Sequence, residues 1–284
     1  MGALRERMRS HMELKGLSPC TMDVYLRQMT CFVRFVGHGP EAMNAEEIRS
    51  YLHHLLIERQ LSQSTVNQAY SALRLFYEQI LGQTWEERTI PHAKQRRKLP
   101  VVLTPPEVEA LFAATRNAKY RALFMTIYSG GLRVAEVTHL CPKDIDSQRM
   151  LICVRQGKGN KDRYTLLSKR ALEALREYWQ HYRPEGWLFP GLWGHQPLTT
   201  SSVQRAFKCT VALAGLKKAA TPHTLRHSFA THLLESGVTL YHIQRLLGHR
   251  QAATTAVYLH LTHGDLSRID NPMDQWPALD APAS

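Results

Sequence analysis

The sequence has no long apolar run. No stretch of its 284 residues approaches the length of about 20 apolar residues that a helix needs to cross a bilayer. The first ten residues, MGALRERMRS, also lack the apolar core of a signal peptide. These two absences argue against a membrane protein and against a secreted one, so we expect a cytoplasmic protein.

Cysteine is scarce, and its spacing suggests no pairing. The five cysteines are odd in number, widely scattered and never in a C-x-x-C pair. This distribution argues against a disulfide framework and against a thiolate zinc site. Cys31 and Cys153 sit within apolar patterns, so we expect both to be small buried side chains.

Acidic residues are outnumbered by basic ones. The chain has 24 Asp and Glu against 36 Lys and Arg, which gives a net charge of +12. Basic proteins attract polyanions by Coulomb forces and by the release of counterions. The charge therefore favours a nucleic-acid partner, although a ribosome-associated or membrane-surface protein can be as basic.

Strand patterns are missing from the first 85 residues. Apolar residues recur there at helical spacing, in segments that begin near Ser18, Asn44 and Ser62. Asn44 and Glu47 have the spacing of a capping box. We expect residues 1–85 to form a small helical domain.

Residues 86–103 break the helical pattern with prolines and with the basic run KQRRK. Such a run is often only a solvated surface. Its position between two domains of a basic protein favours a linker that lies along a phosphate backbone. The side chains expected to contact DNA here are Lys94, Arg96, Arg97 and Lys98.

A second domain is expected over residues 104–264. Its first segment, TPPEVEALF, has the capping Thr, the early Pro and the Glu of a helix start. One hairpin is predicted, in which MLICVRQ and RYTLLS flank the turn GKGNKD, and the remaining segments have helical spacing. The fold class is therefore mainly α with a small β-hairpin or sheet (α+β). Residues 265–284 form an acidic tail with four Asp and one Arg.

The stretch TPHTLRHSFATHLLESG, at 221–237, contains the first candidate site. His223 and Arg226 are three residues apart and project from the same side of a predicted helix start, where backbone N–H groups and the helix dipole favour an anion. Arg adds a fork that matches phosphate, and His can exchange protons near neutral pH. Taken alone, H-x-x-R is more often a capped surface helix. The spacing of His223 and His227 also suits zinc, but no Glu follows the first His and no thiolate is near, so we expect no metal.

Four further stretches contribute candidates. SGGLRVAEV places Arg133 after a Gly pair, where backbone can approach a ligand closely. QGKGNKDR presents Lys158 at a hairpin tip, LLGHR offers His249, and TTAVYLHL gives Tyr258 nine residues later. Each signal is weak alone, because a Lys in a turn is usually solvated and a Tyr in an apolar run is usually part of the core.

In this order the candidates resemble the tyrosine recombinase (phage integrase) family, whose pattern is Arg, hairpin Lys, H-x-x-R, His or Trp, and then Tyr. HTLRHSFATHLLESG and LLGH with its following Tyr are the most specific matches. LSPCTMDVYLRQMTCFVRFV is similar to the start of the family's helical core-binding domain, and KLPVVLTPPEVEALF to the entry of its catalytic domain. The likeness covers most of the chain and is greatest to Xer-like recombinases and to integrases of mobile elements. The acidic, Pro-containing tail is peculiar to this chain.

The resemblance implies a role for each candidate. Arg133 and Arg226 clamp the oxygens of a DNA phosphodiester, and His249 adds a hydrogen bond. Tyr258 is the nucleophile, His223 is the candidate for handling its proton, and Lys158 protonates the leaving 5′ oxygen.

Three other residues receive supporting roles from the resemblance. Glu136 is implied as a carboxylate that orients the basic groups. Lys161 and Arg163, on the predicted hairpin, are implied to contact DNA.

The family's reaction conserves bond energy in a 3′-phosphotyrosyl link that a 5′ hydroxyl then reverses, so neither ATP, metal nor another cofactor is expected. The implied partner is double-stranded DNA with a specific recombination site. Two strand exchanges pass through a Holliday junction within a homotetramer on two DNA sites. The SAM-like core-binding domain and the catalytic domain would form a C-shaped clamp on each duplex, and an accessory DNA-bending protein is compatible with this scheme.

Two alternatives remain open at the level of sequence. A type IB topoisomerase shares the Arg, Lys, Arg, His and Tyr chemistry, but the small helical N-terminal domain and HSFATHLL favour a recombinase. A non-catalytic DNA-binding protein could keep the fold, yet each catalytic position holds a competent residue. The sequence does not reveal the DNA site, the direction of the reaction, or whether Tyr258 acts in its own subunit or in a neighbour.

Overall fold

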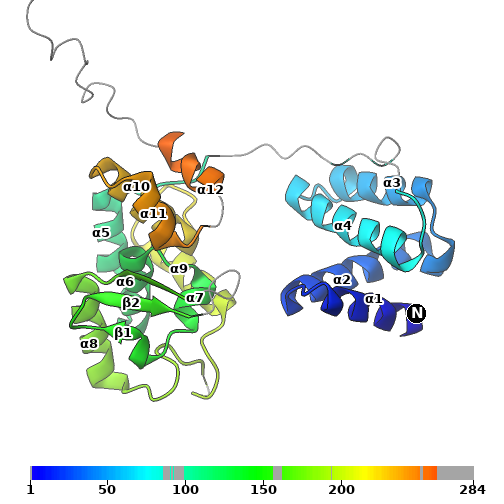
Figure 1. The fold of residues 1–284 in the computed structure, drawn as a ribbon. Helices are drawn as coiled ribbons and strands as arrows, with labels where there is room; N and C mark the ends of the chain where they lie inside the picture. The colour runs from blue at the N-terminus through cyan, green and yellow to red at the C-terminus, as the bar shows by residue number, and fades with distance from the viewer. Residues whose placement is uncertain are drawn as a thin grey trace, which may run out of the picture. The chain divides into compact units, whose positions relative to one another are not determined.

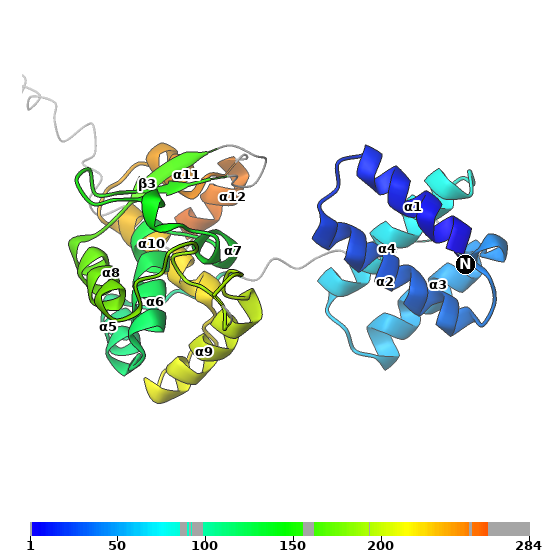
Figure 2. The same ribbon diagram turned by 90° about the horizontal axis from the view of Figure 1, so that it is seen from below.

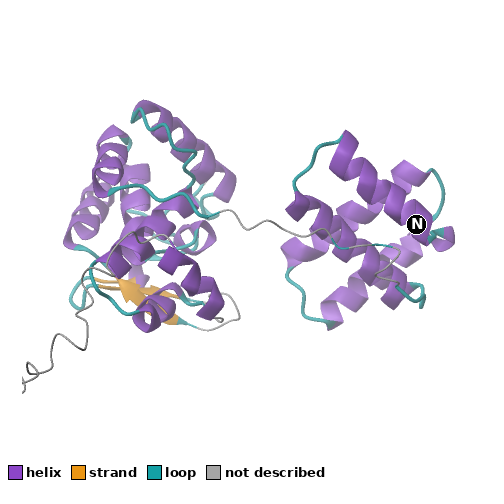
Figure 3. Cartoon of the chain, turned by 90° about the horizontal axis from the view of Figure 1, so that it is seen from above, coloured by secondary structure: helices purple, strands orange, loops and turns teal. Residues whose placement is uncertain are grey.

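The computed structural model describes residues 2–85, 90, 92, 99–155, 162–192, 194–249 and 252–260. The chain divides into two compact units, Met1–Arg97 and Lys98–Ser284. Helices dominate both, and the second unit contains a small sheet (Figures 1 and 3). The predicted α+β class is confirmed. Within the described residues no helix is long and apolar enough to span a membrane.

The first unit is a bundle of four helices, α1 (Gly2–Leu14), α2 (Pro19–Val36), α3 (Ala45–His53) and α4 (Gln63–Leu75). A π-helical turn extends each of the last two, at His54–Glu58 and Phe76–Ile80. α2 packs against α4, with α1 and α3 beside it (Figure 2). Asn44 and Glu47 form the predicted capping box before α3, at 2.9 and 3.1 Å. The described part of this unit is helical, as its apolar spacing predicts.

The second unit is built around α6 (Ala118–Gly130), which packs against α8 (Lys169–Tyr182) and α10 (Pro222–Glu235). Residues on all sides of α6 are buried, which is what a helix surrounded by others requires. The other helices are α5 (Pro105–Ala114), α7 (Val134–Thr138), α9 (Thr200–Leu213), α11 (Leu240–Leu247) and α12 (Ala252–Ala256). A 3₁₀ turn, Val257–His260, follows α12. Figure 1 shows α10, α11 and α12 gathered at one end of the unit.

The sheet is antiparallel with the order β1 (Ile145–Asp146), β2 (Leu151–Val154) and β3 (Arg163–Leu166). β2 and β3 are the predicted hairpin, and their last described pair is Val154 with Arg163. β1 was not anticipated, because two residues are too few to show an alternating pattern. β3 also contacts α11, so the base of the hairpin lies beside the helix that leads to His249.

The expectation of two buried thiols is wrong. Cys31 is exposed and Cys153 is only partly buried. α2 buries Met29 and Phe32, and a residue two positions beyond Met29 faces nearly the opposite way on a helix. In β2 the buried side chains are those on either side of Cys153, so the strand alternation turns this cysteine to the other face.

Candidate active site

The site begins at the tight turn that ends α6. Gly131 has a φ of +58°, and a Cβ there would lie 2.5 Å from the ring of Phe229 and 2.7 Å from Leu247. The turn therefore lets α10 and α11 close on the end of α6, whereas the sequence suggested a close approach to a ligand. The carbonyl of Gly131 accepts a hydrogen bond of 2.7 Å from Nη1 of Arg226. This contact brings Arg226 to the segment that carries Arg133.

Arg226 is held rigidly inside the protein. Its side chain is 4% exposed, and its Nη2 donates to the carbonyl of Leu247 at 2.8 Å. Burial, together with the charge of Arg133, lowers its pKa to about 10. The guanidinium therefore stays charged at neutral pH in an orientation that two backbone carbonyls determine.

Glu136 is the carboxylate at the centre of the site. It accepts hydrogen bonds from the backbone N–H and Nη1 of Arg133, at 2.8 and 2.6 Å, and from Nη1 and Nη2 of Arg163, at 2.9 and 2.8 Å. Its distance to Arg226 is 3.6 Å. Burial alone would raise its pKa, but the hydrogen bonds and charges of Arg163 and Arg133 lower it to about 2. Glu136 is therefore ionised at neutral pH and holds the guanidinium groups of Arg133 and Arg163 by hydrogen bonds.

This cluster has more positive than negative charge. Three guanidinium groups, those of Arg133, Arg163 and Arg226, surround the one carboxylate of Glu136. These four groups therefore have a net charge of +2, an arrangement that is costly to bury unless an anion binds there. A phosphodiester carries one negative charge and gathers more at its transition state. The cluster is electrostatically suited to that group.

The guanidinium of Arg163 bonds to groups of the protein itself, whereas the resemblance implies a contact with DNA. Its side chain is 11% exposed, and besides the two bonds to Glu136 its Nε donates to the carbonyl of Leu246 at 2.9 Å. Gly248 lies directly over it, because a Cβ on Gly248 would be 2.9 Å from Cδ of Arg163. Arg163 therefore fastens the base of the hairpin to α7 and to the end of α11.

His249 follows α11 and lies against Arg226. Its Nε2 is 3.1 Å from Nη2 of Arg226, and its Nδ1 is 2.9 Å from the hydroxyl of Thr255. Burial, followed by the charge of Arg226 and the other arginines, lowers its pKa to about 4. Because arginine can only donate, Nε2 is the acceptor and Nδ1 carries the proton. Thr255, which is fully buried, then accepts the hydrogen bond from Nδ1. The sequence alone does not predict this contact, and its one signal there is the pair of Thr residues that precedes Tyr258.

Tyr258 is buried beside the cluster, with 2% of its surface exposed. Its hydroxyl is 3.1 Å from Nδ1 of His227, and its ring lies parallel to that of His249, with centroids 6.4 Å apart. Burial raises the pKa of Tyr258, although Arg226 and Arg133 offset part of the rise. Burial and the neighbouring charges also lower the pKa of His227 to about 4. The pair is therefore a protonated phenol beside a neutral imidazole.

His223 lies at the exposed start of α10. Partial desolvation and then the charges of Arg226 and Arg133 lower its pKa, so it belongs to the same electrostatic site. Among the hydrogen bonds of the described residues, the contact to the Tyr258 hydroxyl comes from His227, where the sequence suggested His223. The sequence signal for His227 is its spacing of four residues from His223, which we weighed only as a zinc motif.

The remaining predicted site residues lie outside the described part of the chain: Lys94, Arg96, Arg97, Lys98, Lys158 and Lys161. The described ends of β2 and β3 show where the hairpin begins. Arg163 is the first residue of β3, and its guanidinium bonds to Glu136. The hairpin that carries Lys158 therefore starts from the cluster itself.

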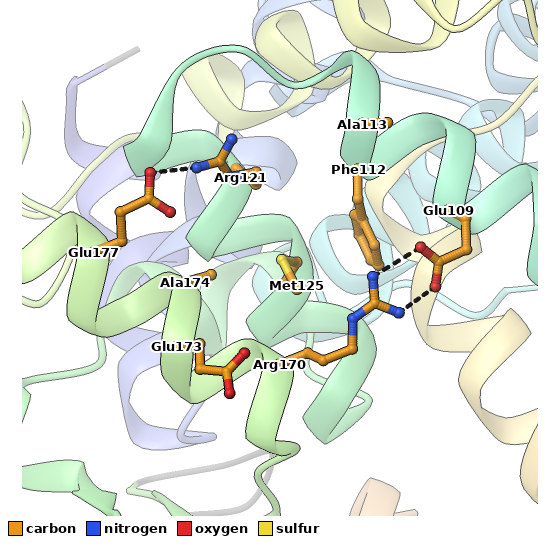
Figure 4. Close-up of a pocket in the computed structure, with 9 residues that line it drawn as sticks. All are labelled: Glu109, Phe112, Ala113, Arg121, Met125, Arg170, Glu173, Ala174 and Glu177. Carbon is orange, nitrogen blue, oxygen red and sulfur yellow. Dashed lines mark hydrogen bonds and ion pairs between the residues drawn. The ribbon is translucent and has the colours of Figure 1, made fainter.

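A hollow elsewhere in the same unit provides a contrast to the arginine cluster (Figure 4). It encloses about 330 Å³ between α5, α6 and α8. Arg170 pairs there with Glu109, and Arg121 with Glu177, while Glu173 adds a further carboxylate. Carboxylates exceed guanidinium groups in this hollow, so it is unsuited to phosphate. Across the described residues, no group of three or more His, Cys, Asp or Glu is placed to hold a metal ion.

Comparison with known proteins agrees with this geometry. The sequence pattern of the Phage integrase family matches residues 101–264, and that of the Phage integrase N-terminal SAM-like domain matches residues 4–87. The chain belongs to the phage integrase family of tyrosine recombinases. The predicted family is thereby confirmed.

Relatives and solved structures of the family match along nearly all of this tyrosine recombinase. The Sinorhizobium fredii protein y4qK, an integrase/recombinase by name, is 41% identical over 98% of this chain and 90% of its own. The tyrosine recombinase XerC of Halalkalibacterium halodurans is 37% identical over 90% and 91%. The crystal structure of XerA recombinase has 29% identity and a TM-score of 0.56, covering 94% of this chain and 96% of that one. A lambda integrase dimer bound to a COC′ core site has the same fold, with a TM-score of 0.73 at 20% identity over 91% and 94%.

Proposed function

We propose that this tyrosine recombinase breaks and rejoins DNA strands at a specific site through a covalent link between Tyr258 and a DNA 3′ phosphate. The observation that carries the proposal is the position of the Tyr258 phenol. It lies beside a cluster that holds two surplus positive charges and is suited to a phosphodiester.

The reaction uses the cluster as a phosphate clamp. Arg133 and Arg226 bind the non-bridging oxygens, and Tyr258 attacks phosphorus. Oriented donors of this kind stabilise the charge that develops in the transition state. The P–O5′ bond breaks, and Lys158 supplies a proton to the leaving 5′ oxygen. A 5′ hydroxyl later attacks the phosphotyrosine, which re-forms a DNA strand and frees Tyr258 without any input of ATP.

His249 is expected to join the clamp only when phosphate binds. In the free protein its Nε2 accepts a hydrogen bond from Arg226 and has no proton to donate. The negative charge of a bound phosphate opposes the arginine charges that lower the pKa of His249. Proton uptake at Nε2 would then provide the expected hydrogen bond to the phosphate.

Tyr258 attacks within its own subunit in this proposal. Its phenol already contacts His227 of the same chain, and its ring lies parallel to that of His249, with centroids 6.4 Å apart. A mixture of the Tyr258→Phe and Arg226→Ala variants tests this point. Attack within one subunit leaves every active site of the mixture incomplete, so no covalent adduct should form; adduct in the mixture would show donation between subunits.

The proposed assembly on DNA is the one that the resemblance of the chain to its family implies. Two strand exchanges through a Holliday junction would take place in a homotetramer on two DNA sites, with each duplex held in a C-shaped clamp and the basic linker along its backbone. XerH recombinase, whose fold is similar, has been crystallised with its palindromic difH substrate after cleavage. That likeness, at 23% identity, supports the fold alone, so the DNA site of this chain needs its own experiment.

A nicked duplex whose short downstream fragment diffuses away tests the proposal. Wild-type protein should become trapped on the 3′ side of the break, in EDTA and without nucleotide, and Tyr258→Phe should bind the DNA without forming the adduct. An adduct on the 5′ side would refute the proposal. Relaxation of supercoiled DNA that carries a single site would instead indicate a topoisomerase, and DNA binding with no adduct at all would indicate a non-catalytic DNA-binding protein.

A further inference from the structure

Helix α10 carries a second histidine that touches the nucleophile. Nδ1 of His227 is 3.1 Å from the hydroxyl of Tyr258, and the two rings are 5.8 Å apart. We propose that His227 is a catalytic residue that accepts the proton of Tyr258 during strand cleavage and returns it during rejoining. This inference rests on the proposed function and adds to it the residue that activates the nucleophile.

Burial of the phenol makes a protein acceptor necessary. Tyr258 is 2% exposed, so bulk water has little access to its proton. Burial also raises the pKa of the Tyr258 phenol, so this hydroxyl is protonated before it attacks. A nucleophile of this kind needs an adjacent base.

The other two histidines of the site are placed differently. The ring of His249 is parallel to that of Tyr258, with 10° between the planes, and its two nitrogens already contact Arg226 and Thr255. His223 is exposed at the start of α10, and no hydrogen bond to Tyr258 is found for it among the described residues. His227 is the histidine whose nitrogen meets the phenol.

The surroundings of His227 keep its imidazole neutral, so that it can accept a proton. The groups that face it are His223 and Arg226 on α10, His249 after α11, and Tyr258 on the last turn. Burial and the positive neighbours lower its pKa to about 4, so the imidazole is neutral and can accept a proton at neutral pH. A phosphodiester that enters the cluster brings negative charge, which strengthens the imidazole as a base while the reaction proceeds.

Each bond and each proton is accounted for in both cleavage and rejoining. As the bond between the Tyr258 oxygen and phosphorus forms, the phenolic proton passes to Nδ1 of His227, and the P–O5′ bond breaks with protonation of the 5′ oxygen by Lys158. During rejoining the 5′ hydroxyl attacks phosphorus and gives its proton back to Lys158. The bond from phosphorus to the Tyr258 oxygen breaks, and His227 returns the proton to the phenol.

The test measures the rate of adduct formation on the nicked duplex. His227→Phe keeps a ring and removes the acceptor, and His227→Asn keeps an oxygen that can hold the hydroxyl but is no base. Both variants should slow the adduct by ~10²–10⁴-fold, which is the usual contribution of a general base, while their DNA affinity stays at the wild-type value. A fluorinated tyrosine installed at position 258 has a more acidic phenol, so it should restore much of the rate to His227→Phe and change the wild type little.

A matched control lies on the same helix. His232 makes the same type of contact, with its Nδ1 2.8 Å from the hydroxyl of Tyr128, outside the arginine cluster. His232→Asn should therefore leave the adduct rate unchanged. A wild-type rate in His227→Asn, or no rescue of a folded His227→Phe by the fluorinated tyrosine, would overturn the role of His227. Failure of the wild type itself to form the adduct would count against the proposed function instead.

Discussion

Replacing Glu136 by Gln should separate stability from DNA binding in this recombinase. The pKa of Glu136 falls from 4.5 to about 2, which at about 1.4 kcal/mol per unit corresponds to roughly 3 kcal/mol of stabilisation at neutral pH. The side chain is 8% exposed, so solvent screening reduces this figure little. Glu136→Gln keeps the shape and removes the charge, and we expect the free energy of unfolding to fall by about that amount.

The pH dependence of this loss has a definite sign. Because the pKa of Glu136 is lower in the folded protein, its stabilisation is fully present above about pH 4.5 and disappears as the pH falls through 2. Urea unfolding at a series of pH values should therefore show a constant difference between wild type and variant near neutrality that shrinks in acid. Glu173→Gln, in the exposed hollow of Figure 4, is the control and should change stability by less than about 0.5 kcal/mol.

The same variant should behave differently toward DNA. Without the carboxylate the cluster holds three positive charges, so DNA affinity should be maintained or increased. Adduct formation should slow, because Arg133 and Arg163 lose the group that orients them both. Unchanged stability at neutral pH, or a loss of DNA binding in a folded variant, would refute this account of the cluster.

Three further predictions concern other parts of the chain. Gly131→Ala should lower the free energy of unfolding by about 1–2 kcal/mol through backbone strain and by a further ~1–3 kcal/mol through overlap with Phe229 and Leu247. Gly215→Ala is the control, because Gly215 has a similar φ with open space around it, so only the strain should lower its stability. Equal losses of stability in urea unfolding would contradict the packing argument. Lys158→Ala should slow cleavage with DNA affinity intact, and a substrate with a sulfur leaving group at the scissile 5′ position should restore the rate; failure of that rescue would make Lys158 a DNA-binding residue. Neutralising Arg96, Arg97 and Lys98 together should weaken DNA binding and reduce its salt dependence without altering the preference for DNA sequence. An unchanged salt dependence would indicate that KQRRK is a solvated surface segment with no DNA contact.

The sequence predicted those features that depend on local spacing. The capping boxes at Asn44 and Thr104 and the hairpin strands follow from periodicity and cap chemistry over a few residues. The family pattern also selected Arg226, His249 and Tyr258, which the structure brings together from α10, the end of α11 and the last turn.

Contacts between distant segments could not be obtained in this way. The resemblance implies a DNA contact for Arg163, and nothing near it in the sequence shows that Glu136 and the end of α11 surround it. The sequence around His227 does not indicate a contact with the nucleophile, because its partner Tyr258 is 31 residues away. In both cases the role depends on which helix packs against which, and residue spacing along one element contains no such information.

The most direct test of the central claim is to identify the residue that becomes bonded to DNA. Protein trapped on the nicked duplex in EDTA can be digested with nuclease and trypsin and then analysed by mass spectrometry. Cleavage after Arg250 and Arg268 gives the peptide QAATTAVYLHLTHGDLSR, in which Tyr258 is the single tyrosine. The account predicts a nucleotide joined through its 3′ phosphate to Tyr258 of this peptide. A nucleotide on any other peptide, a link through a 5′ phosphate, or a strict requirement for divalent metal would contradict it.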